Sequence, residues 1–272
     1  MGMSRAVLAS SATLSLDSRV VMLANNRFRV GERVGEGGMG VVFAAWDRCL
    51  ARTVAIKLSR VGATRSCWAS RARLLREAEA LALVCDPNVV RLVDVGVDGG
   101  MAWLAMERLI AAPLSGRRWT RAEVVHIGRQ IGGALAAVHD AGLVHRDVTP
   151  RNILVGSSGH AWLIDFGLAR VAGPTSGDSF TDLLLSSDDG TSGTRRFMAP
   201  EQCRGGPVDA AADQYSLCAT LLATAHADQP EGAADGFAGV RRVLERGCEE
   251  LPARRYPDMR AFVVALSRCG GR

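Results

Sequence analysis

Residues 145–152 read HRDVTPRN, and the tripeptide DFG follows at residues 165–167. These two segments are the main basis for the fold that we expect for the chain. Asn152 and Asp165 offer the hard oxygen ligands that suit magnesium, which takes few protein ligands and completes its shell with phosphates. The carboxylate of Asp147 could accept the proton of an incoming hydroxyl. Together the segments indicate a site where a hydroxyl meets a metal-bound phosphate.

A glycine cluster lies upstream, between two strand signals. It reads GEGGMGVV over residues 35–42 and fits the pattern G-x-G-x-x-G-x-V. Glycines let backbone N–H groups approach phosphate oxygens without a Cβ clash. A Rossmann fold uses similar glycines but continues directly into a helix, whereas the strand-like Val41-Val42-Phe43 follows here. Taken alone, the pattern also fits a glycine-rich hairpin that binds no ligand.

The chain contains one lysine, Lys57, within the segment VAIK and among 33 basic residues. Its retention in an arginine-rich chain indicates a place where a compact point charge is needed rather than a planar guanidinium. Beside phosphates, its ammonium would neutralise their charge, and a carboxylate would have to orient it. Glu77 is the best placed, with Glu79 as an alternative on another helix face. A solvated Glu77 paired locally with Arg73 is the structural alternative.

Composition limits the function classes. Of the 272 residues, 48% are apolar and 22% are charged, which is typical of a soluble globular protein. The net charge of +5 would suit a nucleic acid. The arginines are scattered, however, so we expect no nucleic-acid partner. Seven cysteines without a C-x-x-C pair favour free thiols. No apolar run reaches the ~18 residues of a membrane span, so we expect no span and a cytoplasmic location.

The pattern along the chain changes near residues 107–112, from β-rich with one helix to mostly helical. We expect a tail over residues 1–26, a small lobe over about 27–108 and a larger lobe over about 109–268, which together give an α+β, two-lobed fold. Strand signals occur at 28–30, 41–43, 53–56, 89–97 and 101–106, and helix signals at 69–84 and 121–141.

These motifs, followed by Ala199-Pro200-Glu201, occur in one order that is known from a single family. Over about residues 27–268 the sequence resembles the eukaryotic-type (Hanks-type) protein kinase family, and its bacterial serine/threonine members most of all. The resemblance implies a two-lobed protein kinase fold with a β-rich N-lobe and a helical C-lobe. It also implies transfer of the γ-phosphate of ATP, with Mg²⁺, to serine or threonine hydroxyls of protein substrates.

The resemblance further implies roles for individual residues. Asp147 would orient the substrate hydroxyl and take its proton, and Asn152 and Asp165 would hold magnesium. Lys57 would bind the α- and β-phosphates and pair with Glu77. The residues implied in ATP binding line the phosphates, the adenine pocket or the connection between the lobes: Gly35, Glu36, Gly37, Gly38, Gly40, Val42, Ala55, Lys57, Glu77, Met106, Glu107, Leu109 and Leu154.

Other residues would support this site from behind. By the resemblance, Leu81, Phe166 and His145 would stack as a hydrophobic spine. Asp213, in the segment ADQY, would anchor the catalytic loop from a buried helix. Glu201 would form an ion pair with Arg255.

Two departures from the family pattern affect the prediction. Thr149 stands where serine/threonine members usually carry a lysine that steadies the γ-phosphate, and Arg151 could partly replace it. Thr194 favours serine/threonine specificity, because such kinases place a threonine there beside the catalytic aspartate. The stretch after Asp213 is shorter than usual and loop-like over 226–236, so the helix that commonly docks substrates is reduced or missing.

The loop over residues 171–193 is expected to act as a phosphorylation switch. In the family, the arginine before the catalytic aspartate, here Arg146, pairs with a phosphate on this loop. A dimer is one arrangement for autophosphorylation. A solvated loop with Arg146 paired to Asp188 or Asp189 is the alternative. The candidate hydroxyls, with Thr191 first, are Ser179, Thr181, Ser186, Ser187, Thr191 and Ser192.

Two other functions stay open at this point. One is a pseudokinase or scaffold module that binds nucleotide without efficient transfer. The other is a kinase-fold enzyme that acts on a small molecule. The presence of Lys57, Asp147, Asn152 and Asp165 favours an active enzyme. The Ala-Pro-Glu segment favours a protein substrate.

Overall fold

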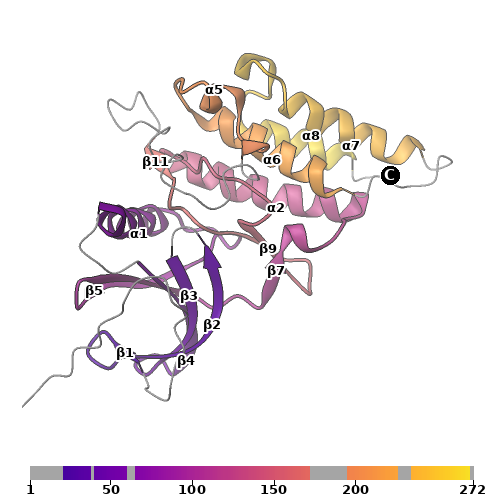
Figure 1. Ribbon diagram of the computed structural model, residues 1–272. Coiled ribbons are helices and arrows are strands. Elements are labelled where there is room, and N and C mark those ends of the chain that lie inside the picture. Colours follow the sequence, from indigo (N-terminus) through magenta and orange to yellow (C-terminus); the bar gives the residue numbers. More distant parts are fainter. Residues whose placement is uncertain (1–20, 38–39, 60–64, 172–194, 226–233, 270–272) are drawn as a thin grey trace, which may run out of the picture. The chain divides into compact units, whose positions relative to one another are not determined.

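The computed structural model describes residues 21–37, 40–59, 65–171, 195–225 and 234–269 (Figure 1). The chain divides into two compact units. The first unit consists of Met1–Leu74 and Val93–Arg108, and the second of Leu75–Leu92 and Leu109–Arg272. Among the helices of the described ranges, none is both long and apolar enough to cross a membrane.

A six-stranded sheet forms most of the first unit, with the strand order β1-β2-β3-β4-β6-β5. Its strands are β1 (Met22–Leu23), β2 (Phe28–Gly37), β3 (Gly40–Asp47), β4 (Arg52–Leu58), β5 (Leu92–Asp98) and β6 (Met101–Glu107). The tail expected over 1–26 is therefore wrong at its end. Met22 and Leu23 pair with β2, and Leu23 is buried in the core.

One face of this sheet carries the core of the first unit. Val54 and Ile56 of β4 are fully buried there, together with Phe28, Trp103 and Ala105. The rings of Phe28 and Trp103 meet edge to face, with their centroids 5.3 Å apart. Because side chains alternate along a strand, Ala55 and Lys57 of β4 point to the other face.

The second unit contains most of the helices. They are α2 (Arg121–Asp140), α5 (Pro200–Cys203), α6 (Ala210–Thr224), α7 (Ala234–Gly247) and α8 (Met259–Cys269), with short 3-10 turns η1 (Leu114–Gly116) and η3 (Pro252–Arg254). Helix α1 (Arg65–Leu83) divides between the two units. Short strands are β7 (Ala111–Pro113), β8 (Leu143–Val144), β9 (Ile153–Gly156), β10 (Ala161–Leu163) and β11 (Arg170–Val171), in the sheets β10-β9-β7 and β11-β8.

Helix α2 packs against α6, α7 and α8 (Figure 1). A capping box formed by Thr120 and Glu123 begins the helix. Glycines then allow a close approach to α8. A Cβ atom at Gly128 would lie 2.6 Å from a methyl carbon of Leu266, and one at Gly132 would lie 2.5 Å from Val263. The predicted helix at 121–141 is confirmed, and these glycines explain its tight seam with α8.

Residues 75–92, which lie within the N-lobe expected over about 27–108, belong to the second unit. The reason is a set of hydrogen bonds around Asn88. Its side-chain amide donates to Gln130 Oε1 (2.9 Å) and to the carbonyl of Ala161 (2.8 Å), and its carbonyl accepts from Leu163 N (2.7 Å). Val89 also bridges to Leu163, so the strand predicted from residue 89 begins only at β5.

A short connection joins α6 to α7 in the C-terminal part of the chain. Residues 225–233 separate α6 from α7. The loop predicted over 226–236 is wrong at its end, because α7 begins at Ala234. Residues 226–233 lie outside the described ranges.

Candidate active site

In the first unit, several residues expected around ATP share one face of the sheet. The strand register pairs Gly35 with Val42, Val42 with Lys57, and Ala55 with Met106. Paired residues in antiparallel strands project to the same side. This row therefore lies on the face opposite to the core, and it presents the lone lysine beside small and apolar side chains.

Two charged residues of the predicted site, Lys57 and Glu77, are unusually buried. Lys57 is only 7% exposed and Glu77 only 1%. Burial of a charged group is costly unless it has partners, so both positions are specialised rather than solvated. Glu79 is exposed, which separates it from Glu77. The alternative of a solvated Glu77 is thereby excluded. Glu77 belongs to the second unit and Lys57 to the first.

The glycine-rich turn connects β2 to β3, where Gly37 pairs with Gly40. Gly40 has φ +149°, and a Cβ atom there would lie 2.3 Å from the carbonyl oxygen of Leu58, so only glycine fits. Around Gly35, by contrast, an added Cβ would meet no atom within 4 Å. Packing therefore does not require a glycine at residue 35. The free space around it leaves room for a ligand to approach. Gly38 lies outside the described residues.

In the second unit, the catalytic loop brings Asp147 and Asn152 together. Asn152 Nδ2 donates to the backbone carbonyl of Asp147 (2.9 Å) and to its carboxylate (2.8 Å). Its own carbonyl accepts from Ile164 N (2.9 Å), which ties this loop to the segment before Asp165. Because the amide nitrogen of Asn152 is used in this way, its side-chain oxygen is the atom suited to a cation.

The segment around Asp165 is held in a turn. Asp165 has φ +65°, a left-handed conformation that is costly for a residue other than glycine, and its carboxylate accepts from Gly167 N (3.3 Å). The next residue, Phe166, is fully buried, and its ring lies edge to face with His145 at 4.7 Å. The expected contact of Phe166 with His145 is confirmed.

Asp213 anchors the catalytic loop as expected. Its carboxylate accepts the backbone N–H groups of His145 (2.8 Å) and Arg146 (2.7 Å), and a hydrogen bond from His139 Nε2 (2.9 Å). Arg146 has φ +69°, a strained backbone that these bonds stabilise. Complete burial opposes ionisation of Asp213, but the hydrogen bond and charge of His139 still lower its pKa.

His145 is buried in a neutral form. Burial lowers its pKa and outweighs the opposing charges of Asp213 and Asp165. Its Nδ1 accepts from Asp147 N (3.3 Å), while its Nε2 lies 3.3 Å from the carbonyl of Ile164 and carries the proton. A proton added to Nδ1 would break the bond to Asp147.

We expect the free energy of unfolding to fall as pH drops below 6.5. The unfolded chain binds a proton at His145 near pH 6.5, whereas the folded chain resists it, so stability is lost as pH falls from 6.5 towards the lowered folded pKa. The slope from one group reaches at most about 1.4 kcal/mol per pH unit. Chemical denaturation between pH 5 and 8 measures it. In His145→Asn, whose amide oxygen can replace Nδ1, the profile should be flatter, and parallel profiles would contradict the assignment.

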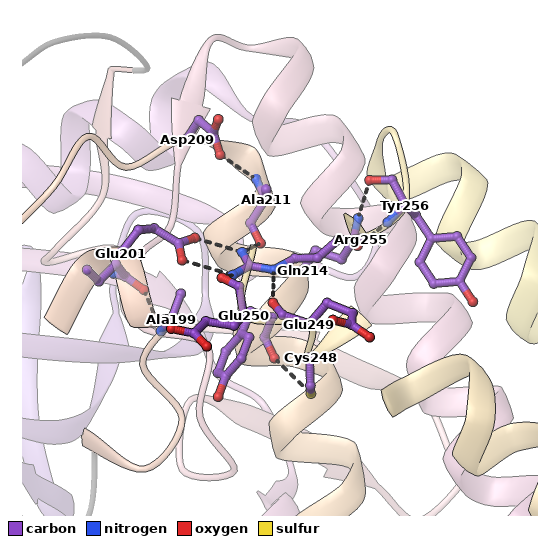
Figure 2. Close-up of polar contacts among 12 residues, drawn as sticks. Ala199, Glu201, Asp209, Ala211, Gln214, Cys248, Glu249, Glu250, Arg255 and Tyr256 are labelled. Atoms are coloured by element: carbon purple, nitrogen blue, oxygen red, sulfur yellow. Dashed lines mark hydrogen bonds and ion pairs between the residues drawn. The ribbon is translucent and has the colours of Figure 1, made fainter. Parts of the chain in front are cut away.

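A second anchor lies at the segment Ala199-Pro200-Glu201 (Figure 2). The buried guanidinium of Arg255 donates to both carboxylate oxygens of Glu201, at 2.7 and 2.9 Å. It also donates to the carbonyls of Glu249 (2.8 Å), Ala211 (2.9 Å) and Glu250 (3.2 Å). The expected ion pair is confirmed, and its full set of partners offsets the cost of burying the charge.

Two supporting contacts were not predicted from the sequence. Gln202 Nε2 donates to the carbonyl of Arg146 (3.2 Å), and Thr220 Oγ1 donates to the carbonyl of Val148 (3.0 Å). Both side chains are buried. For Thr220, the available signal was a polar residue within the mostly apolar run LCATLLAT of α6.

The remaining predicted residues are distributed over both units. Glu107 ends β6 opposite Val54 in the first unit, while Leu109 and Leu154 lie half-buried in the second. A cavity of about 880 Å³ in the second unit lies between β7, the first half of α2 and the turn after β9. None of the predicted site residues lines this cavity, so the cavity is not the predicted active site.

The donor set suits a divalent cation bound largely by substrate phosphates. Within the described ranges, no group of three or more His, Cys, Asp and Glu side chains could hold a metal alone. The carboxylate of Asp165 and the amide oxygen of Asn152 are hard oxygen atoms of the kind that magnesium combines with phosphates.

A family model described as the protein kinase domain matches residues 28–246. The chain belongs to the protein kinase family. A serine/threonine-protein kinase of Mycobacterium tuberculosis, PknD, is 37% identical over 260 residues, which cover 85% of the chain and 38% of the relative. The probable serine/threonine-protein kinase pknA2 of Bifidobacterium longum is 32% identical over 210 residues, covering 74% of the chain and 26% of the relative.

A solved kinase has the same fold. The crystal structure of a mutant PknI kinase domain from Mycobacterium tuberculosis matches with a TM-score of 0.65 and 26% identity, covering 90% of this chain and 96% of that one. The predicted α+β kinase fold is confirmed. The chain spans about a quarter to two fifths of the length of the curated relatives described above. Membership of the protein kinase family implies ATP and a divalent metal.

Proposed function

We propose that this chain is a serine/threonine protein kinase that transfers the γ-phosphate of ATP to hydroxyls of protein substrates, with Mg²⁺ as the metal. The observation that carries the proposal is the catalytic loop. Asp147 is held by two hydrogen bonds from Asn152, and the loop behind it is fixed by Asp213. The names of the bacterial relatives support serine/threonine specificity.

The residues of the chain supply position and charge. Asp147 orients the incoming hydroxyl and takes its proton as the phosphate transfers. Lys57 neutralises the α- and β-phosphates, and the glycine turn covers them. Magnesium, when bound by Asn152 and Asp165, would neutralise charge that develops on the phosphate oxygens. No covalent intermediate with the enzyme is required.

Two alternatives are weaker. A pseudokinase is disfavoured because Lys57, Asp147, Asn152 and Asp165 are all retained. A small-molecule kinase is disfavoured by the well-built anchor of Glu201, which fixes the segment expected to face protein substrates. The short stretch between α6 and α7 affects which proteins can dock, not whether transfer occurs.

Incubation of the purified chain with radiolabelled ATP, magnesium and a generic basic protein tests the proposal. We expect label on serine or threonine of the basic protein, and its loss in Asp147→Asn. Equal label on the basic protein after incubation with the wild type and with Asp147→Asn would indicate a contaminating kinase. Binding of ATP without any transfer would favour the pseudokinase and overturn the proposal.

The lone lysine gives a sharper prediction. In Lys57→Arg the charge is kept, but the broad guanidinium should misplace the phosphates. We expect a loss of at least ~10-fold in kcat/KM, equal to about 1.4 kcal/mol of transition-state stabilisation. Arg52→Lys, an exposed change in the same strand, is the matched control and should leave kcat/KM unchanged. Near-normal kinetics of Lys57→Arg would mean that Lys57 does not contact phosphates.

We further infer that the loop before Glu201 is phosphorylated by the enzyme itself. The candidate hydroxyls, and Asp188 and Asp189, lie outside the described residues. The support comes from Arg146, which is 8% exposed and whose Nε has no hydrogen-bond partner among the described residues. Such a buried donor is costly unless an acceptor reaches it, and a phosphate supplies strong acceptors.

Mass spectrometry after incubation with ATP and magnesium measures this autophosphorylation. Phosphate should occur within residues 179–192, with Thr191 the first choice, and it should be absent from the Asp147→Asn control. An enzyme that phosphorylates other proteins but carries no phosphate in that window would contradict the switch and leave the kinase assignment intact.

A further inference from the structure

Two cysteines of the second unit, Cys218 and Cys248, lie on neighbouring elements. Cys218 is fully buried on α6, and Cys248 directly follows the last residue of α7. Each thiol lies near enough to the other to shift the pKa of its partner. Cys248 also donates to the carbonyl of Tyr215, one turn before Cys218 on α6 (3.8 Å). These are two thiols brought together by packing, although they are far apart in sequence.

The helix crossing at this point is built around the Cys218 sulfur. A Cβ atom at Gly247 would lie 2.2 Å from Cys218 Sγ and 3.1 Å from its Cβ. Any side chain at residue 247 would therefore push α6 and α7 apart. The glycine brings the backbone next to Cys248 against Cys218, and so fixes the two sulfurs on facing elements.

The two thiols differ in their surroundings. Cys218 is out of reach of solvent, and burial raises the pKa of its thiol well above the usual value. Cys248 is partly exposed. Interaction with the Cys218 thiol lowers the pKa of Cys248, an effect that burial opposes and the charge of Arg255 supports. The thiolate is the reactive form, so the accessible member of the pair is also the more nucleophilic one.

We propose that Cys218 and Cys248 form an oxidation site at which a hydroperoxide, with hydrogen peroxide as the simplest case, creates a disulfide between α6 and the end of α7. The Cys248 thiolate attacks one peroxide oxygen, the O–O bond breaks, and Cys248 becomes a sulfenic acid while water or an alcohol leaves. The Cys218 sulfur then attacks the Cys248 sulfur, and hydroxide leaves with the Cys218 proton as water. The two thiols lose two electrons and the peroxide gains them.

The site has a structural consequence for its neighbours. Cys248 continues directly into Glu249 and Glu250, whose carbonyls hold the guanidinium of Arg255 (Figure 2). A disulfide has an S–S distance of ~2.05 Å, so its formation would tie α6 directly to the residue that follows α7. Oxidation therefore acts next to the ion pair of Arg255 with Glu201, and it closes a loop of about 30 residues.

The test uses the full chain, reduced, desalted and treated with increasing hydrogen peroxide. Remaining thiols are then blocked, and non-reducing peptide mapping identifies the linked cysteines. We expect one disulfide, Cys218 to Cys248, formed at lower peroxide than any other cysteine oxidation and reversed by dithiothreitol. The oxidised chain should melt roughly 5 °C higher than the reduced one. No such link, or links dominated by other cysteines, would overturn the proposal.

Two variants assign the roles of the thiols. In Cys218→Ala, peroxide should leave Cys248 as a sulfenic acid that dimedone labels, because no second thiol resolves it. Cys248→Ala should abolish both the link and the label. Cys203→Ala, at an exposed cysteine, is the matched control and should still form the link. Label on Cys218 instead of Cys248 would overturn the assignment of Cys248 as the attacking thiol. The wild-type map is decisive even where a variant folds poorly.

Discussion

In Asp165→Asn, phosphoryl transfer should fall by at least ~1,000-fold, which corresponds to about 4 kcal/mol of transition-state stabilisation. The amide keeps the shape of the side chain and can still accept from Gly167 N. It removes the negative charge that we expect to hold magnesium beside the phosphates. The rate is measured with labelled ATP and a saturating protein substrate, and circular dichroism checks the fold.

The matched control is Asp140→Asn, at an exposed ion pair with Arg260 at the end of α2. It makes the same chemical change at a surface position and should leave transfer unchanged. A magnesium titration adds a second readout, because Asp165→Asn should need more metal for its residual activity. Full turnover of a natively folded Asp165→Asn would remove Asp165 from the metal site.

The second large effect is expected at Asp213. In Asp213→Asn, one of the backbone N–H groups of His145 and Arg146 would face an amide NH₂ group instead of a carboxylate oxygen. A buried donor without an acceptor costs about 3 kcal/mol when a charged partner is lost. The melting temperature should fall by roughly 6–10 °C. Transfer should fall as well, because the strained backbone at Arg146 loses its support.

Asp209→Asn provides the control within the same helix. Asp209 is exposed and caps α6 by accepting from Ala211 N (2.9 Å), and asparagine caps a helix about as well. Its melting temperature should stay close to that of the wild type. An unchanged melting temperature in Asp213→Asn would show that His145 and Arg146 do not depend on this carboxylate.

Much of the fold and site could be predicted because the deciding residues stand in short motifs. Asp147 and Asn152 stand in one short segment, and the structure joins them by hydrogen bonds. The role of Asp213 followed from the resemblance, and its carboxylate accepts the backbone N–H of His145. Glu77 was preferred over Glu79 as the partner of Lys57, and of the two only Glu77 is buried. Asp147 and Asn152 were predictable because they are neighbours in sequence as well as in space, whereas the place of Asp213 beside them required the family pattern.

Other features depend on contacts that leave no local pattern. The sequence of α1 shows no change in composition along the helix. Nothing in it therefore indicates that residues from Leu75 onward pack with the second unit. The reason lies in Asn88, whose partners Gln130 and Ala161 are distant in sequence. Strand β1 is too short to show alternation, and it is followed by left-handed residues at 24–26 that break any period.

The anchoring of the catalytic loop has a consequence for the order in which the enzyme becomes competent during its synthesis. The ribosome makes the segment with Asp147 well before the helix that carries Asp213, and Arg255 comes later still. At about 5–20 residues per second, several seconds separate these events. A nascent chain that already exposes all its phosphate-handling motifs therefore still lacks the supports that position them. We expect phosphorylation to begin only after translation has passed the final helices.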